Sequence, residues 1–245
     1  MRQDMVSFFS SKMAPRLTAV ILFTVGAILL LLNLGSGSLY PWDESLSAMR
    51  AWHMYTDGIS LTVRTFGSPD FNKPPLYYWM AAAMFHLLEP GLLALRLPGV
   101  LFAFGCSIVV YFLAKRITNS SWAACFALAC LALNPHWFNF ARLGKLEAVV
   151  AFSLVSSVLW GCFASGRHTR AGGVILALLL AVSAWAKHPF FGLIIPAFYL
   201  YWRFCDKVGK PAVPFLWASG TFLLIGGVVS HRPVSLGKRI LEFLF

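Results

Sequence analysis

The sequence predicts an all-α fold: a polytopic transmembrane helical bundle with interfacial helices in its first extracytoplasmic loop. Composition carries most of this prediction, because 59% of the 245 residues are hydrophobic, only 12% are charged, and the mean hydropathy is +0.73. A soluble fold of this size does not hide so much apolar surface. The 9 Trp, 7 Tyr and 22 Phe suit a chain that crosses two lipid-water interfaces repeatedly, since aromatic rings settle at headgroup depth.

The charge pattern favours a membrane partner over nucleic acid. The formal net charge is +11, but the basic residues stand singly or in pairs between apolar runs and form no single polar patch. Anionic membrane lipid is therefore the expected partner.

The cysteines are interpreted as buried thiols. All five fall in or at the ends of apolar runs, without a Cys-x-x-Cys or Cys/His pairing. We expect neither a disulfide nor a zinc site from them; they are Cys106, Cys125, Cys130, Cys162 and Cys205.

Apolar stretches separated by short polar breaks predict about seven spans in one transmembrane domain covering residues 1–245. The first follows a basic flank and resembles a signal peptide, but its length of roughly 18 residues suffices to cross ~30 Å of hydrocarbon and favours an uncleaved helix. The predicted spans are 17–34, 97–113, 120–136, 148–164, 171–186, 189–202 and 213–230.

Short basic connections and the placement of the carboxylates predict the orientation together, since the lysines and arginines alone divide ten to each side. A cytoplasmic N-terminus places Lys115-Arg116, the turn at 167–170 and the loop at 203–210 in the cytoplasm, as the positive-inside rule requires. Of the 9 acidic residues, only Asp4 and Asp206 then lie inside, so the acidic chemistry gathers on the extracytoplasmic face. The glycosylation sequon at 119–121 falls in the cytoplasm and is discounted.

The extracytoplasmic loop 35–96 is too long for a turn and too aromatic for a disordered linker, so we expect it to fold on the membrane surface. Two interfacial helices are predicted in it. The first follows from apolar and aromatic residues at helical spacing. The second, at 77–88, is bounded by Lys73-Pro74-Pro75 and Glu89-Pro90-Gly91. The spacing of the first helix is carried by Trp42, Leu46, Met49 and His53.

Adjacent carboxylates at Asp43 and Glu44 stand where the chain leaves the first span. Each raises the proton affinity of the other, and nearby lipid raises it further, which makes an Asp a useful base near neutral pH. The alternative is structural: Asp43 caps a helix and Glu44 lies in its first turn.

Three basic stretches on the same face are candidates for phosphate binding. Lys73 lies between prolines and aromatics at headgroup level, where it either meets a lipid phosphate or snorkels above an aromatic belt. Arg142 and Lys145 share a face if their segment is helical, with Glu147 pointing away; topological markers are the alternative. In the stretch Lys187-His188-Pro189, His188 is interpreted as a structural donor and not as a metal ligand.

Together these stretches resemble the GT-C superfamily of polyprenyl-phosphate-sugar glycosyltransferases, and within it the family 39-like branch of lipid A aminoarabinose transferases and protein O-mannosyltransferases. Each motif alone is weak, but five in the family's order, over about residues 15–200, are fairly specific. The matching stretches are Asp43-Glu44, the run Asn72 to Trp79, Arg96-Leu97-Pro98-Gly99, Ala141-Arg142 with Glu147, and Ala186-Lys187-His188-Pro189.

The resemblance implies a GT-C-like fold and roles for the site residues. Asp43 becomes the general base, Glu44 its modulator and Glu147 a further acidic residue of the catalytic site. Lys73, Arg142 and Lys187 become contacts of the donor phosphate, with no metal ligand assigned. Two departures from the family pattern are Glu at 147, where Asp is usual, and His at 188, where Gly is usual. The family is also about twice this length. We therefore expect the chain to correspond to its N-terminal half and to be truncated relative to the full-length family.

The predicted function is transfer of a sugar from a polyprenyl-phosphate donor to a lipid, glycan or protein acceptor on the extracytoplasmic face of the cell membrane. No cofactor beyond the lipid-linked sugar is assigned, and the residues leave a divalent metal undecided. The alternatives are a transporter or flippase-like carrier, or an inactive remnant of a glycosyltransferase. Carriers place charges at mid-membrane on broken helices, whereas here the charges gather at helix ends.

Overall fold

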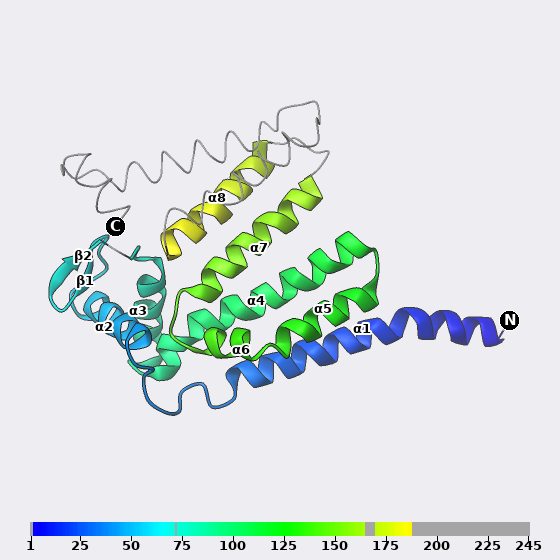
Figure 1. Ribbon diagram of the computed structural model, residues 1–245, viewed down its shortest axis with the longest axis horizontal. Helices are drawn as coiled ribbons and strands as arrows, with labels where there is room; N and C mark the ends of the chain where they lie inside the picture. Colours follow the sequence, from blue (N-terminus) through cyan, green and yellow to red (C-terminus); the bar gives the residue numbers. More distant parts are fainter. Residues whose placement is uncertain (1, 72, 165–169, 188–245) are drawn as a thin grey trace.

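The computed structural model describes residues 2–71, 73–164 and 170–187, and these form a bundle of helices with a small cap at one end (Figure 1). The long helices are α1 (Arg2–Leu31), α4 (Leu92–Thr118), α7 (Glu147–Ala164) and α8 (Arg170–Ala186). Two shorter helices, α5 (Ser121–Ala132) and α6 (Pro135–Arg142), lie between α4 and α7 in sequence.

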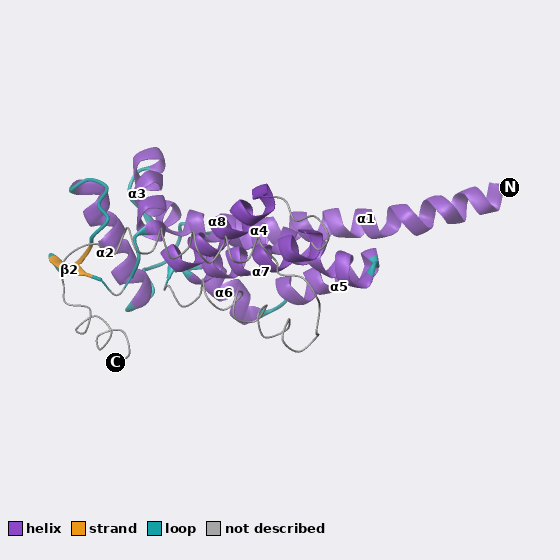
Figure 2. Ribbon diagram, turned by 90° about the horizontal axis from the view of Figure 1, so that it is seen from above, coloured by secondary structure: helices purple, strands orange, loops and turns teal. Residues whose placement is uncertain are grey.

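The cap consists of the predicted interfacial helices and a hairpin that the sequence did not predict. The helices are α2 (Asp43–Thr56) and α3 (Leu76–Leu88), and the antiparallel pair is β1 (Val63–Thr65) with β2 (Ser68–Asp70). Viewed from above, these elements gather at one end of the bundle while α1 extends beyond the other (Figure 2). The predicted fold class, a helical bundle with interfacial helices in its first loop, is confirmed.

Five of the predicted spans fall on described helices: α1, α4, α5, α7 and α8. By length and composition, Met13–Leu31 and Leu92–Thr118 are each sufficient to cross a membrane, and α6 with the first part of α7 forms a third, bent candidate. The spans predicted at 189–202 and 213–230 lie outside the described residues.

Helix boundaries follow local chemistry. The α4 helix ends at Asn119, which adopts a left-handed φ of 53°, a conformation that Asn tolerates better than most residues. The hydroxyl of Ser120 then accepts the backbone N–H of Ala123 and caps α5. At α6, the side chain of Asn134 accepts two backbone N–H groups and Pro135 occupies the first turn.

The core lies where the cap packs on the bundle. The largest buried cluster joins α2, α3, α4 and α7, and the rings of Tyr77 and Tyr78 are fully buried in it. By contrast α1 keeps much of its apolar surface exposed, as expected of a helix that faces lipid. The cap is therefore a packed extension of the bundle, which fixes the candidate residues of the first loop relative to the spans.

The cysteines are partly as predicted. Cys106 and Cys125 are buried, but Cys130 is exposed on α5 and corrects the prediction for that residue. It lies on the exposed surface of an apolar helix, so sequence hydrophobicity did not distinguish it from a core position. The side chains of Cys162 and Cys205 lie outside the described residues.

Candidate active site at the capped end of the bundle

Glu44 forms the buried centre of the site. Its side chain is fully buried, and Arg96 donates to both carboxylate oxygens, from Nε to Oε1 at 2.7 Å and from Nη2 to Oε2 at 3.0 Å. The backbone N–H groups of Tyr40 and Gly144 also donate to it, each at 2.7 Å. Burial alone raises the pKa of Glu44, but the Arg96 and backbone hydrogen bonds outweigh it and hold the pKa below its ordinary value. Glu44 therefore ties the first turn of α2 to α4 and to the segment between α6 and α7.

Arg96 extends this centre to the loop that follows α1. Its Nη1 donates to the carbonyl oxygens of Leu34 and Ser36 at 3.0 and 3.1 Å, and its Nη2 donates to that of Ser38 at 3.0 Å. The chain leaving the first span thus wraps around one guanidinium. Sequence reasoning noted Arg96 as part of a motif but gave it no role, although a charge at the start of a span is itself a signal of function.

Asp43 is placed differently from its neighbour. It is the first residue of α2, its side chain is 63% exposed, and its Oδ2 lies 3.3 Å from Nζ of Lys145. The N-cap position belongs to Trp42, at φ 73°, and no side chain caps the helix. The alternative of an Asp43 cap is therefore wrong, because the carboxylate points to Lys145 and not to the backbone of α2.

Lys145 belongs to a stretch that the sequence marked as a candidate for phosphate binding, although the family resemblance gave this lysine no role of its own. Its side chain is only 7% exposed, and Nζ lies 4.9 Å from the ring centre of Tyr40 and 5.2 Å from that of Phe140. Two aromatic faces and one carboxylate hold the ammonium in place. Lys145 therefore keeps a fixed positive charge beside Asp43.

The segment carrying Arg142, Lys145 and Glu147 is not one helix, which corrects the assumption behind their predicted shared face. The α6 helix ends at Arg142, α7 begins at Glu147, and the two axes differ by 115°. Gly144 makes the bend possible. A Cβ there would lie 2.7 Å from Cγ of the buried Leu95 and 3.3 Å from Cγ of Glu44, so only Gly lets this backbone donate to Glu44.

Glu147 pairs with Lys187 across two helices, with Nζ donating to Oε1 at 2.9 Å. The second oxygen, Oε2, is buried and has no hydrogen-bond partner within the described part of the chain. A buried carboxylate oxygen normally has a donor. Glu147 therefore retains capacity to accept a hydrogen bond, and Lys187 lies beside it at the end of α8.

Lys73 precedes α3, is half-buried, and forms no ion pair with the described residues. The ring centres of Trp79 on α3 and Trp185 on α8 are 5.5 Å apart, so the helix that follows Lys73 contacts the helix that ends just before Lys187. The structure thus brings Asp43 to Lys145 and Glu147 to Lys187, and sets Lys73 on a neighbouring segment. His188 lies outside the described residues.

A cavity of about 580 Å³ opens between the loop after α1 and helix α6. Lys145, Arg96 and Arg142 line it, together with Tyr40, His136 and Asn139. Neither Lys73 nor Lys187 belongs to its lining. Within residues 2–71, 73–164 and 170–187, no three His, Cys, Asp or Glu side chains gather as metal ligands.

The family model for dolichyl-phosphate-mannose-protein mannosyltransferases matches residues 72–231, about two thirds of the sequence. The chain belongs to this family. The resemblance to GT-C glycosyltransferases read from the sequence motifs is thereby confirmed, and with it the assignment to a family of multi-pass membrane proteins.

Solved structures agree with this assignment at the level of the fold. The chain is similar to ArnT from Cupriavidus metallidurans in the apo state, with a TM-score of 0.74, 19% identity, and coverage of 86% of this chain and 41% of ArnT. Against the same protein bound to undecaprenyl phosphate, the TM-score is 0.70 at 19% identity, covering 86% of this chain and 42% of ArnT.

Two curated relatives are uncharacterized proteins of Aquifex aeolicus (strain VF5). One is 29% identical over 206 residues, which cover 81% of this chain and 40% of the relative. The other is 28% identical over 167 residues, covering 68% of this chain and 38% of the relative. The mannosyltransferase-family chain thus spans about two fifths of the length of these relatives and of ArnT.

Proposed function

We propose that this chain carries the donor-site half of a membrane glycosyltransferase, which moves a sugar from a polyprenyl phosphate to a hydroxyl or phosphate of a lipid, glycan or protein acceptor. Membership of the mannosyltransferase family supports the reaction class, and the lipid bound to ArnT supports a polyprenyl-phosphate donor. The observation that carries the proposal is the exposed carboxylate of Asp43, held 3.3 Å from buried Lys145 at the capped end of the bundle.

The chemistry requires one base and cations for the leaving group. Asp43 accepts the proton of the acceptor oxygen, which attacks the anomeric carbon. The bond from that carbon to the phosphate oxygen breaks, and polyprenyl phosphate leaves with the bonding pair. A positioned base typically contributes 10² to 10⁴-fold, and fixed positive charge near the departing phosphate contributes further in a water-poor site. A single displacement of this kind inverts the anomeric configuration.

The remaining charged residues have two proposed roles, positioning the base and binding the donor phosphate. Glu44 holds the first turn of α2, and with it Asp43, through Arg96 and Gly144. Lys73 and Lys187 are proposed to contact the donor phosphate, because they lie on the neighbouring segments around α3 and α8. Glu147 orients Lys187 at 2.9 Å and presents its second oxygen to a bound hydroxyl. The assignment of Arg142 to the same phosphate stays a prediction.

The capped end of the molecule is proposed to face the extracytoplasmic side of the cell membrane, with the N-terminus in the cytoplasm. The positive-inside pattern supports this orientation, since the basic pair at Lys115 and Arg116 ends α4 at the opposite end of the bundle from α2 and α3 (Figure 1).

Replacing Asp43 by Asn tests the base assignment. We expect transfer from labelled polyprenyl-phosphate sugars to fall by at least about 10²-fold, while the protein stays folded in the membrane, because the exposed Asp43 side chain contributes little to packing. The assay uses membranes containing the full polypeptide and follows loss of label from the lipid.

The matched control is Asp57→Asn, which removes the same charge at the other end of α2, where Asp57 is half-exposed beside Arg64. This variant should keep its turnover. Near-normal transfer by the Asp43→Asn variant would end the base assignment, and no transfer by the unmodified protein would end the proposal that it is an active transferase. Uptake of substrate into vesicles would instead identify a carrier.

A further inference from the structure

All Lys, Arg, Asp and Glu side chains that line the cavity between the loop after α1 and helix α6 are cationic. Three cationic side chains line it, those of Arg96, Arg142 and Lys145, and no carboxylate does. Arg96 is saturated by Glu44 and backbone carbonyls, and Lys145 faces the Asp43 carboxylate. Arg142 is therefore the cation of this lining whose charge no described carboxylate compensates.

Arg142 has no acidic partner in the part of the chain that the structure describes. Its guanidinium donates to the carbonyl oxygen of Leu32 and lies 5.0 Å from the ring centre of Phe138. A guanidinium has five N–H donors, so the Leu32 contact leaves Arg142 further donors, and Arg142 lines the cavity. A planar donor fork of this kind matches the oxygens of a phosphate.

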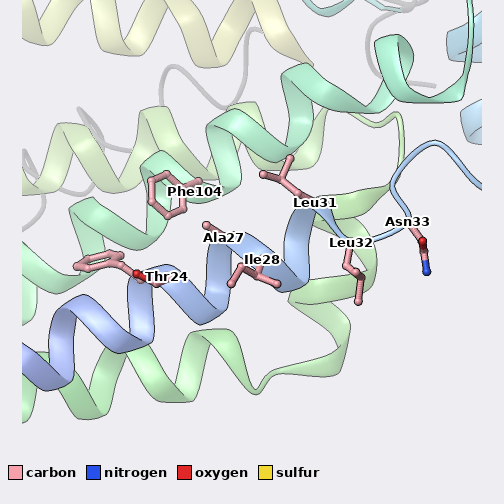
Figure 3. Close-up of a pocket in the computed structure, with 8 residues that line it drawn as sticks. Thr24, Ala27, Ile28, Leu31, Leu32, Asn33 and Phe104 are labelled. Carbon is pink, nitrogen blue, oxygen red and sulfur yellow. The ribbon is translucent and has the colours of Figure 1, made fainter.

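An apolar groove adjoins the same cavity. It has a volume of about 660 Å³ and is lined by one face of α1 and by Phe104 of α4 (Figure 3). Asn33 lines both the groove and the cavity, so the two hollows are neighbours at the end of α1. The other lining residues are Phe23, Thr24, Ala27, Ile28, Leu31 and Leu32.

The groove has the length of a lipid chain in one leaflet. From Phe23 to Leu31 the helix rises about 12 Å at 1.5 Å per residue, and one leaflet is about half of the ~30 Å hydrocarbon core. Arg142 lies at the cavity end of this groove, at the depth where α1 leaves the membrane. The apolar groove is thus placed to hold the acyl chain of a membrane lipid, and the cavity with its cationic side chains is placed to hold the headgroup.

We propose that this paired groove and cavity bind one anionic membrane phospholipid, with its phosphate at Arg142 and one acyl chain between α1 and α4. The site lies on α1 and α6, whereas the donor contacts Lys73 and Lys187 lie around α3 and α8; this inference gives Arg142 to the phospholipid instead of the donor phosphate. The lipid holds the loop at 33–40 against α6, and that loop leads directly to Asp43. The inference goes beyond the transfer reaction and does not depend on it.

Binding is measured without sugar donor or acceptor, so the result is separate from any result on transfer. The purified protein is titrated with phosphatidylglycerol or with phosphatidylcholine of the same acyl chains, and bound lipid is counted by native mass spectrometry. We expect phosphatidylglycerol to bind preferentially. Arg142→Gln should weaken its binding roughly fivefold, the factor expected for one basic residue at an anionic lipid surface. Arg116→Gln, an equal charge loss at the other end of α4, should leave it unchanged.

A second pair of variants tests the groove without changing charge. Ala27→Phe fills the groove and should reduce binding, whereas Val25→Phe places the same ring on the exposed face of α1 outside the lining and should not. Equal binding of both lipids, or unchanged binding by both Arg142→Gln and Ala27→Phe, would overturn the proposal. So would displacement of phosphatidylglycerol by polyprenyl monophosphate through the same residues, since the site would then belong to the donor.

Discussion

At the scale of single residues, the two neighbouring carboxylates have opposite environments. Glu44 is fully buried with four donors around it, and Asp43 is 63% exposed beside one lysine. A carboxylate saturated by hydrogen bonds is a poor proton acceptor, whereas an exposed one is free to meet an acceptor. Although the two residues are adjacent in sequence, Glu44 is a candidate positioning residue and Asp43 is a candidate base.

Replacing Glu44 by Gln should destabilise the folded protein strongly at neutral pH. Removing one partner of a buried ion pair typically costs about 3 to 5 kcal/mol, because Arg96 is left with an uncompensated charge. The pKa of Glu44 is lowered in the folded state, so its contribution is present above the ordinary carboxyl pKa and is lost as pH falls through the lowered value. The difference in unfolding temperature between the two proteins should thus be large at pH 7 and shrink in acid.

Thermal unfolding in detergent at neutral and acidic pH measures this difference, with the exposed Glu89→Gln as the control. A gap of equal size at every pH would contradict the linkage to Glu44 ionisation. Sequence alone identified Glu44 but not its partner, since Arg96 stands 52 positions away and an ion pair at that separation leaves no trace in a single sequence.

At the scale of secondary structure elements, Arg50 connects α2 to both strands of the hairpin and to α3. From α2 its guanidinium reaches the hairpin, donating to Asp70 Oδ2 at 2.7 Å and Thr65 Oγ1 at 2.9 Å, and also α3, through the Tyr78 hydroxyl at 3.1 Å. Lys73 lies in the short segment between Asp70 and Tyr78, so both flanks of that lysine are tied to α2. The hairpin is only two strands of three residues and is marginal without such support.

Arg50→Met should loosen the hairpin and the Lys73 segment while leaving the long helices in place. Asp70 then lacks its buried partner, a loss of about 3 to 5 kcal/mol that is felt locally. Hydrogen exchange should rise at 57–73, and the KM for the lipid donor should rise more than kcat falls. The exposed Arg64→Met variant on the same hairpin is the control. Unchanged exchange at 57–73 would show that Arg50 does not anchor it.

Helices were predicted correctly where apolar residues recur at helical spacing. The bend and the hairpin were not predicted, because contacts with residues distant in sequence determine their backbone conformation. The helices at α2 and α3 follow from spacing and from bounding prolines, and both are found. The bend between α6 and α7 was missed because the short run Leu143 to Leu146 looks helical by composition. Its non-helical path is stabilised by the Gly144 backbone donating to Glu44, and the hairpin likewise depends on a distant arginine.

At the scale of the whole molecule, the two ends of the bundle differ in structure and in the placement of their carboxylates. The cap, Asp43 and Glu147 lie at one end, and the N-terminus with the last turn of α4 lies at the other (Figure 1). The last turn of α4 carries Lys115 and Arg116, and basic residues flanking a span are retained on the cytoplasmic side. The asymmetry predicts one orientation for the whole bundle.

Single cysteines test this orientation in a background whose native cysteines are replaced by serine. Ser68→Cys on the exposed hairpin should react with a membrane-impermeant maleimide in intact cells, because β2 belongs to the cap. Thr118→Cys, exposed at the end of α4, should react only after the membrane is opened. Labelling in the reverse order would place Asp43 in the cytoplasm, where the proposed extracytoplasmic transfer has no site. Labelling of both residues in intact cells would exclude a span between the two ends of α4.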